Sequence, residues 1–214
     1  MADRPKSILL GKDYEALDIL LKLHAPKYIT EDNFILDCTY NKGKMWQGLS
    51  YKPVRMDINP SFEVDVVADF TAMPFVDASF DVIVFDPPFL PIHAASFNSS
   101  RIWELQYGIT ADDSLRRGDN VCPMFMPFLS EARRVLKADG IIIAKIGDLV
   151  HNHKQQFQGV EFVNCAYRVG LCPCDLLIKV RNSNLNSSKW KHVRHLRKTH
   201  SYFFVVRKGS CERK

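Results

Sequence analysis

Residues 82–90, VIVFDPPFL, carry the clearest chemical signature in this 214-residue sequence. An apolar run ends at Asp86, and Pro87, Pro88 and Phe89 follow directly. Because proline fixes φ and pushes the preceding residue into extended geometry, we expect a rigid strand end whose next carbonyls point outward. A carboxylate and a proline carbonyl that accept both N–H bonds of an exocyclic amino group would localise its lone pair toward a methyl donor. Phe89 offers an apolar face on which an unstacked base can lie.

Three further acids stand where earlier apolar runs end, namely Asp37, Asp57 and Asp69. Asp57 follows Asp37 by twenty residues, the separation at which an acid can bind ribose hydroxyls, although a turn-forming Asp would also fit there. Asp69 could accept a bond from an adenine amino group while Phe70 covers the ring. The turn after Asp37 has a single interior glycine, Gly43, whereas a loop that binds a dinucleotide pyrophosphate is richer in glycine. These features predict a pocket for an adenosine-bearing cofactor without phosphates, and S-adenosylmethionine fits that description.

The elements that must position these acids follow from the apolar periodicity. Helical spacing in DYEALDILLKLH predicts a helix over residues 13–24, and SEARRVL predicts a second, followed by a turn at Gly140 and an Ile-rich strand. Strands are also predicted in FILDC, VRMDINP, VDVVADF, FDVIVFDPP, CDLLIKVRN and SYFFVVRK. Such alternation is typical of an α/β layer structure with a mainly parallel sheet, whose ligands sit at the carboxyl ends of the strands.

Length and composition favour one domain over residues 1–214, with 46% hydrophobic and 25% charged residues. Residues 91–120 have weak periodicity, which indicates a loop insertion that either faces the substrate or is disordered. No apolar run reaches the roughly 20 residues of a membrane-spanning helix, and the first residues lack the apolar core of a secretory signal. We therefore expect a cytoplasmic protein without membrane contact.

The net charge of +5 is unevenly distributed. Residues 179–214 hold eleven Lys/Arg and one acid, Glu212, which gives this basic segment a charge of +10. A polyanion, nucleic acid first, is the expected partner, and a solvated C-terminus is the alternative. The run KTHSYFFVVRKG predicts that part of the segment is a folded strand. The candidate nucleic-acid-binding residues are Lys189, Lys191, Arg194, Arg197 and Lys198.

The six cysteines are scattered, and we expect them to be reduced. Cys172 and Cys174 precede His192, His195 and His200, but one residue between two cysteines is not the usual zinc spacing. We therefore predict no metal site.

Together, FILDCTYNKGKMW, RMDINP, VVADF and DPPF resemble the motifs of class I S-adenosylmethionine-dependent amino-methyltransferases, which modify adenine N6 or cytosine N4 in DNA. THSYFFVVRKG resembles the last strand of the bacterial and phage members. The resemblance implies a Rossmann-like, mostly parallel seven-stranded sheet with an antiparallel last strand and helices on both faces. It also implies that the methionine end of S-adenosylmethionine contacts Asp37, Thr39, Tyr40 and Gly43, the ribose Asp57, the adenine Asp69 and Phe70, and the target base Asp86 to Phe89.

An Asp-led tetrapeptide is more typical of the family's adenine enzymes, so adenine N6 in DNA is the preferred target. Two alternatives stay open. One is an amino-methyltransferase of RNA bases, and the other is a non-catalytic nucleic-acid-binding subunit that keeps the fold. The sequence predicts no oligomeric state.

Overall fold

The structure, a computed structural model, describes residues 5–28, 34–88, 124–151, 154–181, 195–196 and 198–209. Its helices are α1 (Asp13–His24), α4 (Phe125–Val135) and α5 (Gln158–Arg168), with short 3-10 turns η1 (Pro26–Tyr28) and η2 (Lys44–Trp46). Its strands are β1 (Ile8–Leu10), β2 (Ile35–Asp37), β3 (Val54–Asp57), β4 (Val66–Val67), β5 (Phe80–Phe85), β6 (Leu136–Ile146), β7 (Leu149–His151), β8 (Lys154–Gln156), β9 (Leu171–Val180) and β10 (His200–Lys208). The loop predicted over residues 91–120 lies outside the described residues, and the single domain remains a prediction.

The main sheet has the strand order β1-β9-β10-β6-β5-β2-β3-β4. Strand β10 is antiparallel to both of its neighbours, β6 and β9, while the other pairs are parallel. The prediction of a mostly parallel sheet with an antiparallel last strand is confirmed. The sheet has one strand more than the seven predicted, because Ile8–Leu10 pairs with the end of β9. Three residues without a helical or alternating pattern gave no sequence signal for this edge strand. Strands β7 and β8 form a separate antiparallel hairpin.

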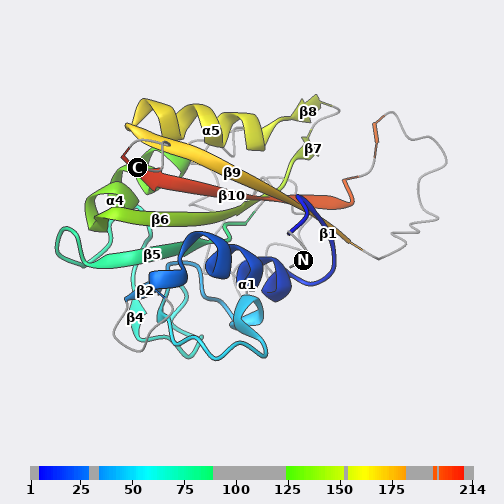
Figure 1. Ribbon diagram of the computed structural model, residues 1–214. Helices are drawn as coiled ribbons and strands as arrows, with labels where there is room; N and C mark the ends of the chain where they lie inside the picture. Colours follow the sequence, from blue (N-terminus) through cyan, green and yellow to red (C-terminus); the bar gives the residue numbers. More distant parts are fainter. Residues whose placement is uncertain are drawn as a thin grey trace.

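Helices cover both faces of the sheet, as predicted, with α1 on one face and α4 and α5 on the other (Figure 1). Successive residues of a strand point to opposite faces. In β5, Val82 and Val84 pack toward α1, whereas Ile83 and Phe85 pack toward α4 and α5. All six residues of β5 are buried, which explains its continuous apolar run.

Helix α1 has the bounds that the sequence predicts. At its start, the backbone N–H of Lys12 donates to the Glu15 carboxylate at 2.9 Å, which satisfies a group outside the helical ladder. The apolar stripe is buried and consists of Ala16, Leu17, Leu20 and Leu21. This stripe fixes the height of α1 above the sheet, and therefore the place of Asp13 at its first turn.

The turn predicted at Gly140 is wrong. Helix α4 passes directly into β6, and Gly140 lies inside that strand. A Cβ atom on Gly140 would lie 3.0 Å from the Asp81 carbonyl oxygen and 2.7 Å from the Leu136 side chain. The glycine therefore permits a close approach of two backbones at the irregularity in the β5–β6 pairing, which is a common role of glycine within a strand.

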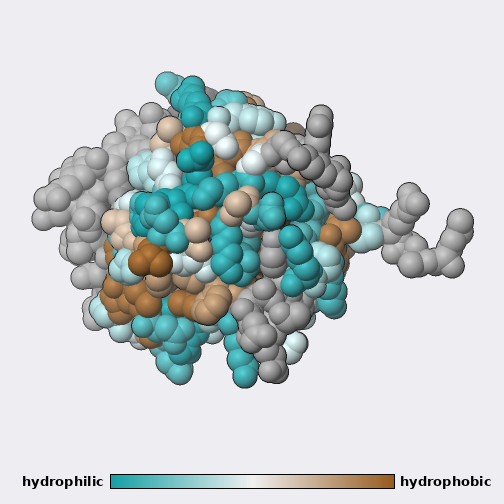
Figure 2. All heavy atoms as spheres, turned by 60° about the vertical axis from the view of Figure 1, so that its left-hand side comes forward, coloured by the Kyte–Doolittle hydropathy of each residue, from teal (hydrophilic) through white to brown (hydrophobic). Residues whose placement is uncertain are grey.

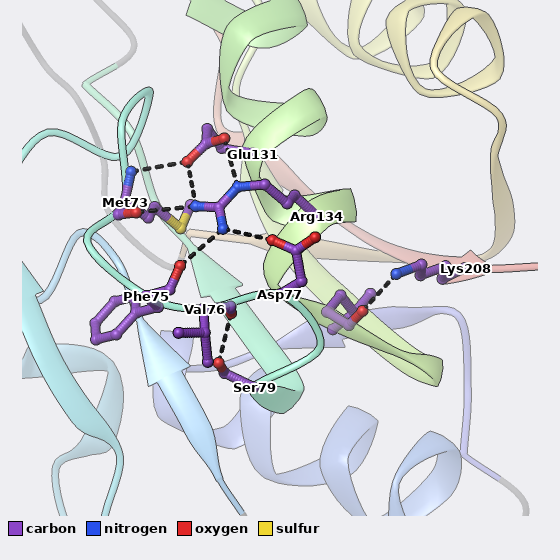
Figure 3. A network of polar contacts seen from close by, with 9 residues as sticks. Met73, Phe75, Val76, Asp77, Ser79, Glu131, Arg134 and Lys208 are labelled. Carbon is purple, nitrogen blue, oxygen red and sulfur yellow. Dashed lines mark hydrogen bonds and ion pairs between the residues drawn. The ribbon is translucent and has the colours of Figure 1, made fainter.

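Arg134 of α4 holds the segment that follows β4 (Figure 3). Its guanidinium donates to the carbonyls of Met73 and Phe75 at 2.9 and 2.7 Å, and to the carboxylates of Glu131 and Asp77 at 2.8 and 2.9 Å. Glu131 in turn accepts the backbone N–H of Met73 at 2.9 Å. We call this network the Arg134 clamp; it ties residues 73–77 to α4.

Since β10 ends at the left of Figure 1 and β5 and β6 run opposite to it, the carboxyl ends of β5 and β6 lie on the right. Figure 2 brings the left side forward and shows hydrophilic residues across the middle of that face, with hydrophobic residues gathered below them. The surface away from the strand carboxyl ends is therefore partly hydrophilic and partly hydrophobic.

The end of β9 and the start of β10 are joined by a hydrogen bond just outside both strands. The backbone N–H of Arg181 donates to the Thr199 carbonyl at 2.7 Å. This bond continues the β9–β10 pairing by one residue on each strand.

The expectation that every cysteine is reduced is wrong for Cys172, which is disulfide-bonded, whereas Cys38, Cys165 and Cys174 are thiols. Within the described ranges, no three His, Cys, Asp or Glu side chains gather as metal ligands would. None of the described helices is long and apolar enough to cross a membrane.

Candidate active site

A pocket of about 340 Å³ opens at the carboxyl ends of β2, β3 and β5. Nine of the residues predicted to form the site line it: Asp37, Thr39, Tyr40, Asp57, Asp69, Phe70, Asp86, Pro87 and Pro88. Gly43 does not. It has a φ of 64°, and a Cβ there would meet the Tyr40 side chain, which does line the pocket. Phe89 lies outside the described residues. Parallel strands thus bring acids from distant parts of the chain to one edge of the sheet.

Asp37 forms the buried floor of the pocket at the end of β2. Its side chain accepts a bond from the Trp46 indole N–H at 2.6 Å and another from the Thr39 backbone N–H at 2.9 Å. Burial raises the pKa of Asp37 to about 7, because a carboxylate loses its hydration there, and the two bonds offset this only in part. Asp37 can therefore change its charge near neutral pH.

Asp57 ends β3 and is also buried. Its two carboxylate oxygens accept backbone N–H bonds from Asn41 at 2.8 Å and from Asn59 at 2.9 Å. Burial raises its pKa as well. The backbone N–H of Ile58 contributes a further bond, and the carboxylate's remaining acceptor capacity can serve a ligand's hydroxyl group.

Asp69 and Phe70 follow β4 on the next part of the pocket wall. Oδ1 of Asp69 accepts both the backbone N–H and the hydroxyl of Thr71 at 2.8 Å. The Phe70 ring packs edge-on against Phe85 and Phe128, with centroids 5.2 and 5.9 Å away. These contacts fix the orientation of an apolar ring beside an acceptor, as an adenine site requires.

Asp86 is held at two points at the end of β5. Its backbone N–H donates to the Thr39 hydroxyl at 2.7 Å, and its Oδ2 accepts from the Lys145 ammonium at 2.9 Å. Burial raises the pKa of Asp86, against the opposing effect of Lys145. Pro87 and Pro88 continue the pocket wall directly after it.

The sequence reasoning missed a chain of alternating charges behind Asp86. Lys145 also donates to Asp13 at 3.1 Å, and Lys179 donates to the other oxygen of Asp13 at 2.6 Å. Both lysines are buried, at 6% and 5% exposure. A signal was present, because alternation places Lys145 on the same face as Ile141 and Ile143, which pack toward α1. A lysine on a buried face needs an acid partner.

The basic segment is only partly free to bind a polyanion. Lys179 is paired with Asp13, Arg207 donates to the His24 carbonyl at 3.4 Å, and Lys208 donates to the Leu136 carbonyl at 2.7 Å. Arg181 is exposed and lines the pocket. Of the predicted nucleic-acid-binding residues, Lys198 is half-buried, and the other four, Lys189, Lys191, Arg194 and Arg197, lie outside the described residues.

Comparisons with known proteins concern the fold. No protein-family model matches the sequence, and a search of the curated proteins finds no match. Among solved structures, a candidate sarcosine dimethylglycine methyltransferase from Galdieria sulphuraria superposes with a TM-score of 0.55 at 13% identity, covering 91% of this chain and 84% of that one. A candidate methyltransferase from Bacillus halodurans C-125 gives 0.53 at 15% identity, covering 92% and 100%.

An S-adenosylmethionine-dependent methyltransferase from Methanosarcina mazei gives a TM-score of 0.50 at 15% identity, covering 86% of this chain and 95% of that one. At such identities the likeness concerns the backbone arrangement alone. The chain has the Rossmann-like α/β fold of class I methyltransferases.

Proposed function

We propose that the protein transfers a methyl group from S-adenosylmethionine to the exocyclic amino group of a nucleic-acid base, with adenine N6 in DNA as the first candidate. One observation carries the proposal. Asp86, the residue directly after β5, is followed by two prolines and lies at the wall of the same pocket that contains Asp37, Asp57 and Asp69.

The charges around the pocket favour a cationic ligand. Asp37 and Asp57 are buried and accept bonds from N–H groups, and the cations Lys42 and Lys44 are exposed at the rim. A pyrophosphate near these two carboxylates would meet like charge, whereas a sulfonium and an ammonium group are attracted. The methionine end of the cofactor belongs beside Asp37, the ribose beside Asp57, and the adenine between Asp69 and Phe70.

The protein's part in the reaction is to orient the acceptor. S-Adenosylmethionine supplies the methyl group on a sulfonium. The amino nitrogen's lone pair would form the new N–C bond as the C–S bond breaks, the sulfur would keep that electron pair, and the nitrogen would pass its proton to water. Asp86 and the Pro87 carbonyl accept the amino N–H bonds, so the lone pair is available in the direction of the methyl group.

The proposal is tested by offering acceptors in parallel. Methylation-free DNA, total RNA and sarcosine are incubated with methyl-labelled cofactor, and the digested nucleosides are identified by mass spectrometry. We expect labelled N6-methyladenine from DNA. Label only in RNA would shift the target to RNA bases, and label only in sarcosine, the small molecule named for the Galdieria protein, would overturn the proposal.

Removal of the Asp86 carboxylate is the first prediction. We expect Asp86→Ala to reduce kcat by at least about 100-fold, because the acceptor loses its electrostatic partner. Calorimetry should show that S-adenosylmethionine still binds, since Asp86 faces the base rather than the cofactor. Glu63→Ala, at an exposed acid of the same charge, is the matched control and should retain full activity. Unchanged turnover in Asp86→Ala would refute the catalytic role.

A non-catalytic subunit is the alternative outside the enzyme class. It predicts no heat of cofactor binding at micromolar protein together with retained nucleic-acid binding. The pocket's acids favour the enzyme, because a scaffold that only binds nucleic acid has no use for a group of acids that repels phosphates.

A further inference from the structure

We propose that Lys145, fixed in place by Asp13, is a positioning residue that orients the Asp86 carboxylate and keeps it charged for the target amino group. The inference rests on the proposed function and deepens it. It assigns a role to Lys145 and Asp13, two residues outside the motifs that carry the family resemblance.

The geometry places Lys145 between two acids from different elements. Its ammonium donates to Oδ2 of Asp86 at 2.9 Å and to Oδ2 of Asp13 at 3.1 Å. Lys145 is carried by β6, which pairs with β5 at the residue before Asp86 through Phe85 and Ala144. Asp13 stands at the first turn of α1. With two acids as partners, the ammonium is held by both elements, β5 through Asp86 and α1 through Asp13.

Asp86 thereby has two fixed points and one available oxygen. The Thr39 hydroxyl holds its backbone N–H and Lys145 holds Oδ2. Among the described residues, none donates a hydrogen bond to Oδ1 of Asp86. Because Pro87 follows, the backbone cannot rotate freely to compensate if the bond to Lys145 is removed. With Lys145 in place, Oδ1 is the oxygen that remains for the amino group.

The charges around Asp86 act in opposite directions. Burial and the negative charge of Asp13 raise its pKa, while Lys145 and Lys179 lower it, and Asp37 is a further acid of the same pocket that repels it. For Lys145, burial disfavours the charge, yet Asp86 and Asp13 outweigh burial and raise the lysine's pKa. A buried carboxylate that lost this cation would tend to become neutral, and a neutral carboxyl accepts N–H bonds poorly.

A purely structural ion pair would show different behaviour. It would lower the stability of the protein when broken, without moving the pH dependence of the reaction. The pH profile of kcat/KM for the nucleic acid, measured at saturating cofactor, therefore separates the two roles.

Lys145→Met should move the acid limb of that profile to higher pH by about one to three pH units, because an opposite charge within hydrogen-bond distance of a carboxylate has an effect of this size. Lys145→Arg restores a cation and should bring the limb back toward the wild-type position. Lys137→Met is the matched control. Lys137 lies on the same strand and is paired with Asp81 at 2.8 Å, but it does not line the pocket. An acid limb unchanged in Lys145→Met would overturn the proposal.

Asp13→Asn provides a test with the opposite sign. Asparagine keeps an acceptor for Lys145 and removes a negative charge that repels Asp86. The acid limb should therefore move to lower pH. General damage to the site would move the acid limb in the same direction in both Lys145→Met and Asp13→Asn. That outcome would count against the proposal.

A readout without substrate separates this inference from the proposed function. In protein labelled with ¹³C at aspartate carboxyls, the Asp86 resonance is assigned by its loss in Asp86→Asn and titrated in wild type and Lys145→Met. We expect the midpoint to rise in the variant. If it rises while no nucleic acid is methylated, the proposed function fails and Lys145 still controls Asp86. If it does not rise, the inference fails whatever the enzyme methylates.

Discussion

Asp37 is the residue whose charge depends most directly on its surroundings. It is 3% exposed, and its bonds come from Trp46 and Thr39 rather than from a cation. Its pKa rises from 3.8 to about 7 by burial. The folded protein therefore holds a proton on Asp37 in a pH range where the unfolded chain has released it.

This difference predicts how stability varies with pH. Between about pH 4 and 7 the native state binds more protons at Asp37 than the unfolded state, so this residue's contribution to the free energy of unfolding falls as pH rises through that window. Asp37→Asn cannot ionise. The stability of this variant relative to wild type should increase across the window, by up to about 4 kcal/mol. Urea unfolding of the ligand-free proteins at several pH values measures the difference in free energy of unfolding between the variant and the wild type. A difference that stays constant with pH would show that Asp37 ionises normally.

At the scale of single residues, the acids at the strand ends could be predicted from the sequence, but the ion pairs of the buried lysines could not. Asp37, Asp57, Asp69 and Asp86 each follow an apolar run, and parallel strands bring such ends together whatever lies between them. The partners Lys145 and Asp13 are 132 residues apart, and only the packing of α1 on the sheet places them in contact. The alternation in β6 indicates that Lys145 is buried, but it does not identify the acid that pairs with it.

Among the secondary-structure elements, the Arg134 clamp joins α4 to the pocket wall. Only Thr71 and Ala72 separate Phe70 from residues 73–77, so the attachment of those residues to α4 limits how far that wall can move (Figure 3). The clamp uses backbone carbonyls as well as carboxylates. Hydrogen bonds that involve a charged group are the stronger kind.

Arg134→Met should therefore lower the free energy of unfolding by about 1–3 kcal/mol. Arg133→Met is the matched control, because Arg133 is the exposed neighbour on the same helix, and it should change stability little. Thermal or urea unfolding measures both. Equal effects of the two substitutions would mean that the clamp contributes nothing beyond helix propensity.

Long periodic elements are predictable from the sequence and close backbone approaches are not. The spacing of apolar residues in α1 predicts both of its ends, because one buried face determines the whole helix. The same local reasoning predicts a turn at Gly140, since an isolated glycine after a helix usually ends it. In the fold the role of Gly140 depends on Asp81 of the neighbouring strand, which no local pattern could reveal.

For the whole molecule, the uneven charge predicts an electrostatic partner. Changing Lys191, Arg194, Arg197 and Lys198 to Gln should weaken nucleic-acid binding, because fewer counterions are released. On duplex DNA the slope of log K against log salt should flatten by about 0.9 for each phosphate that the protein no longer neutralises. Fluorescence anisotropy at several salt concentrations measures the slope.

The control removes equal charge elsewhere, with Gln at four exposed positions: Lys6, Lys52, Lys154 and Arg168. Its slope should stay close to that of the wild type. Equal flattening in both variants would indicate attraction by net charge alone, and no flattening in either would leave the basic segment as a solvated end.

The hydrogen bond between Arg181 and Thr199 has a consequence for how an acceptor reaches the site. It joins the end of β9 to the start of β10 and thereby fixes the backbone of Arg181, a residue of the pocket. Under the proposed function, a cation held at the pocket wall attracts the phosphates of the acceptor toward Asp86. Such attraction raises the local concentration of acceptor, which lowers KM and leaves kcat to the pocket.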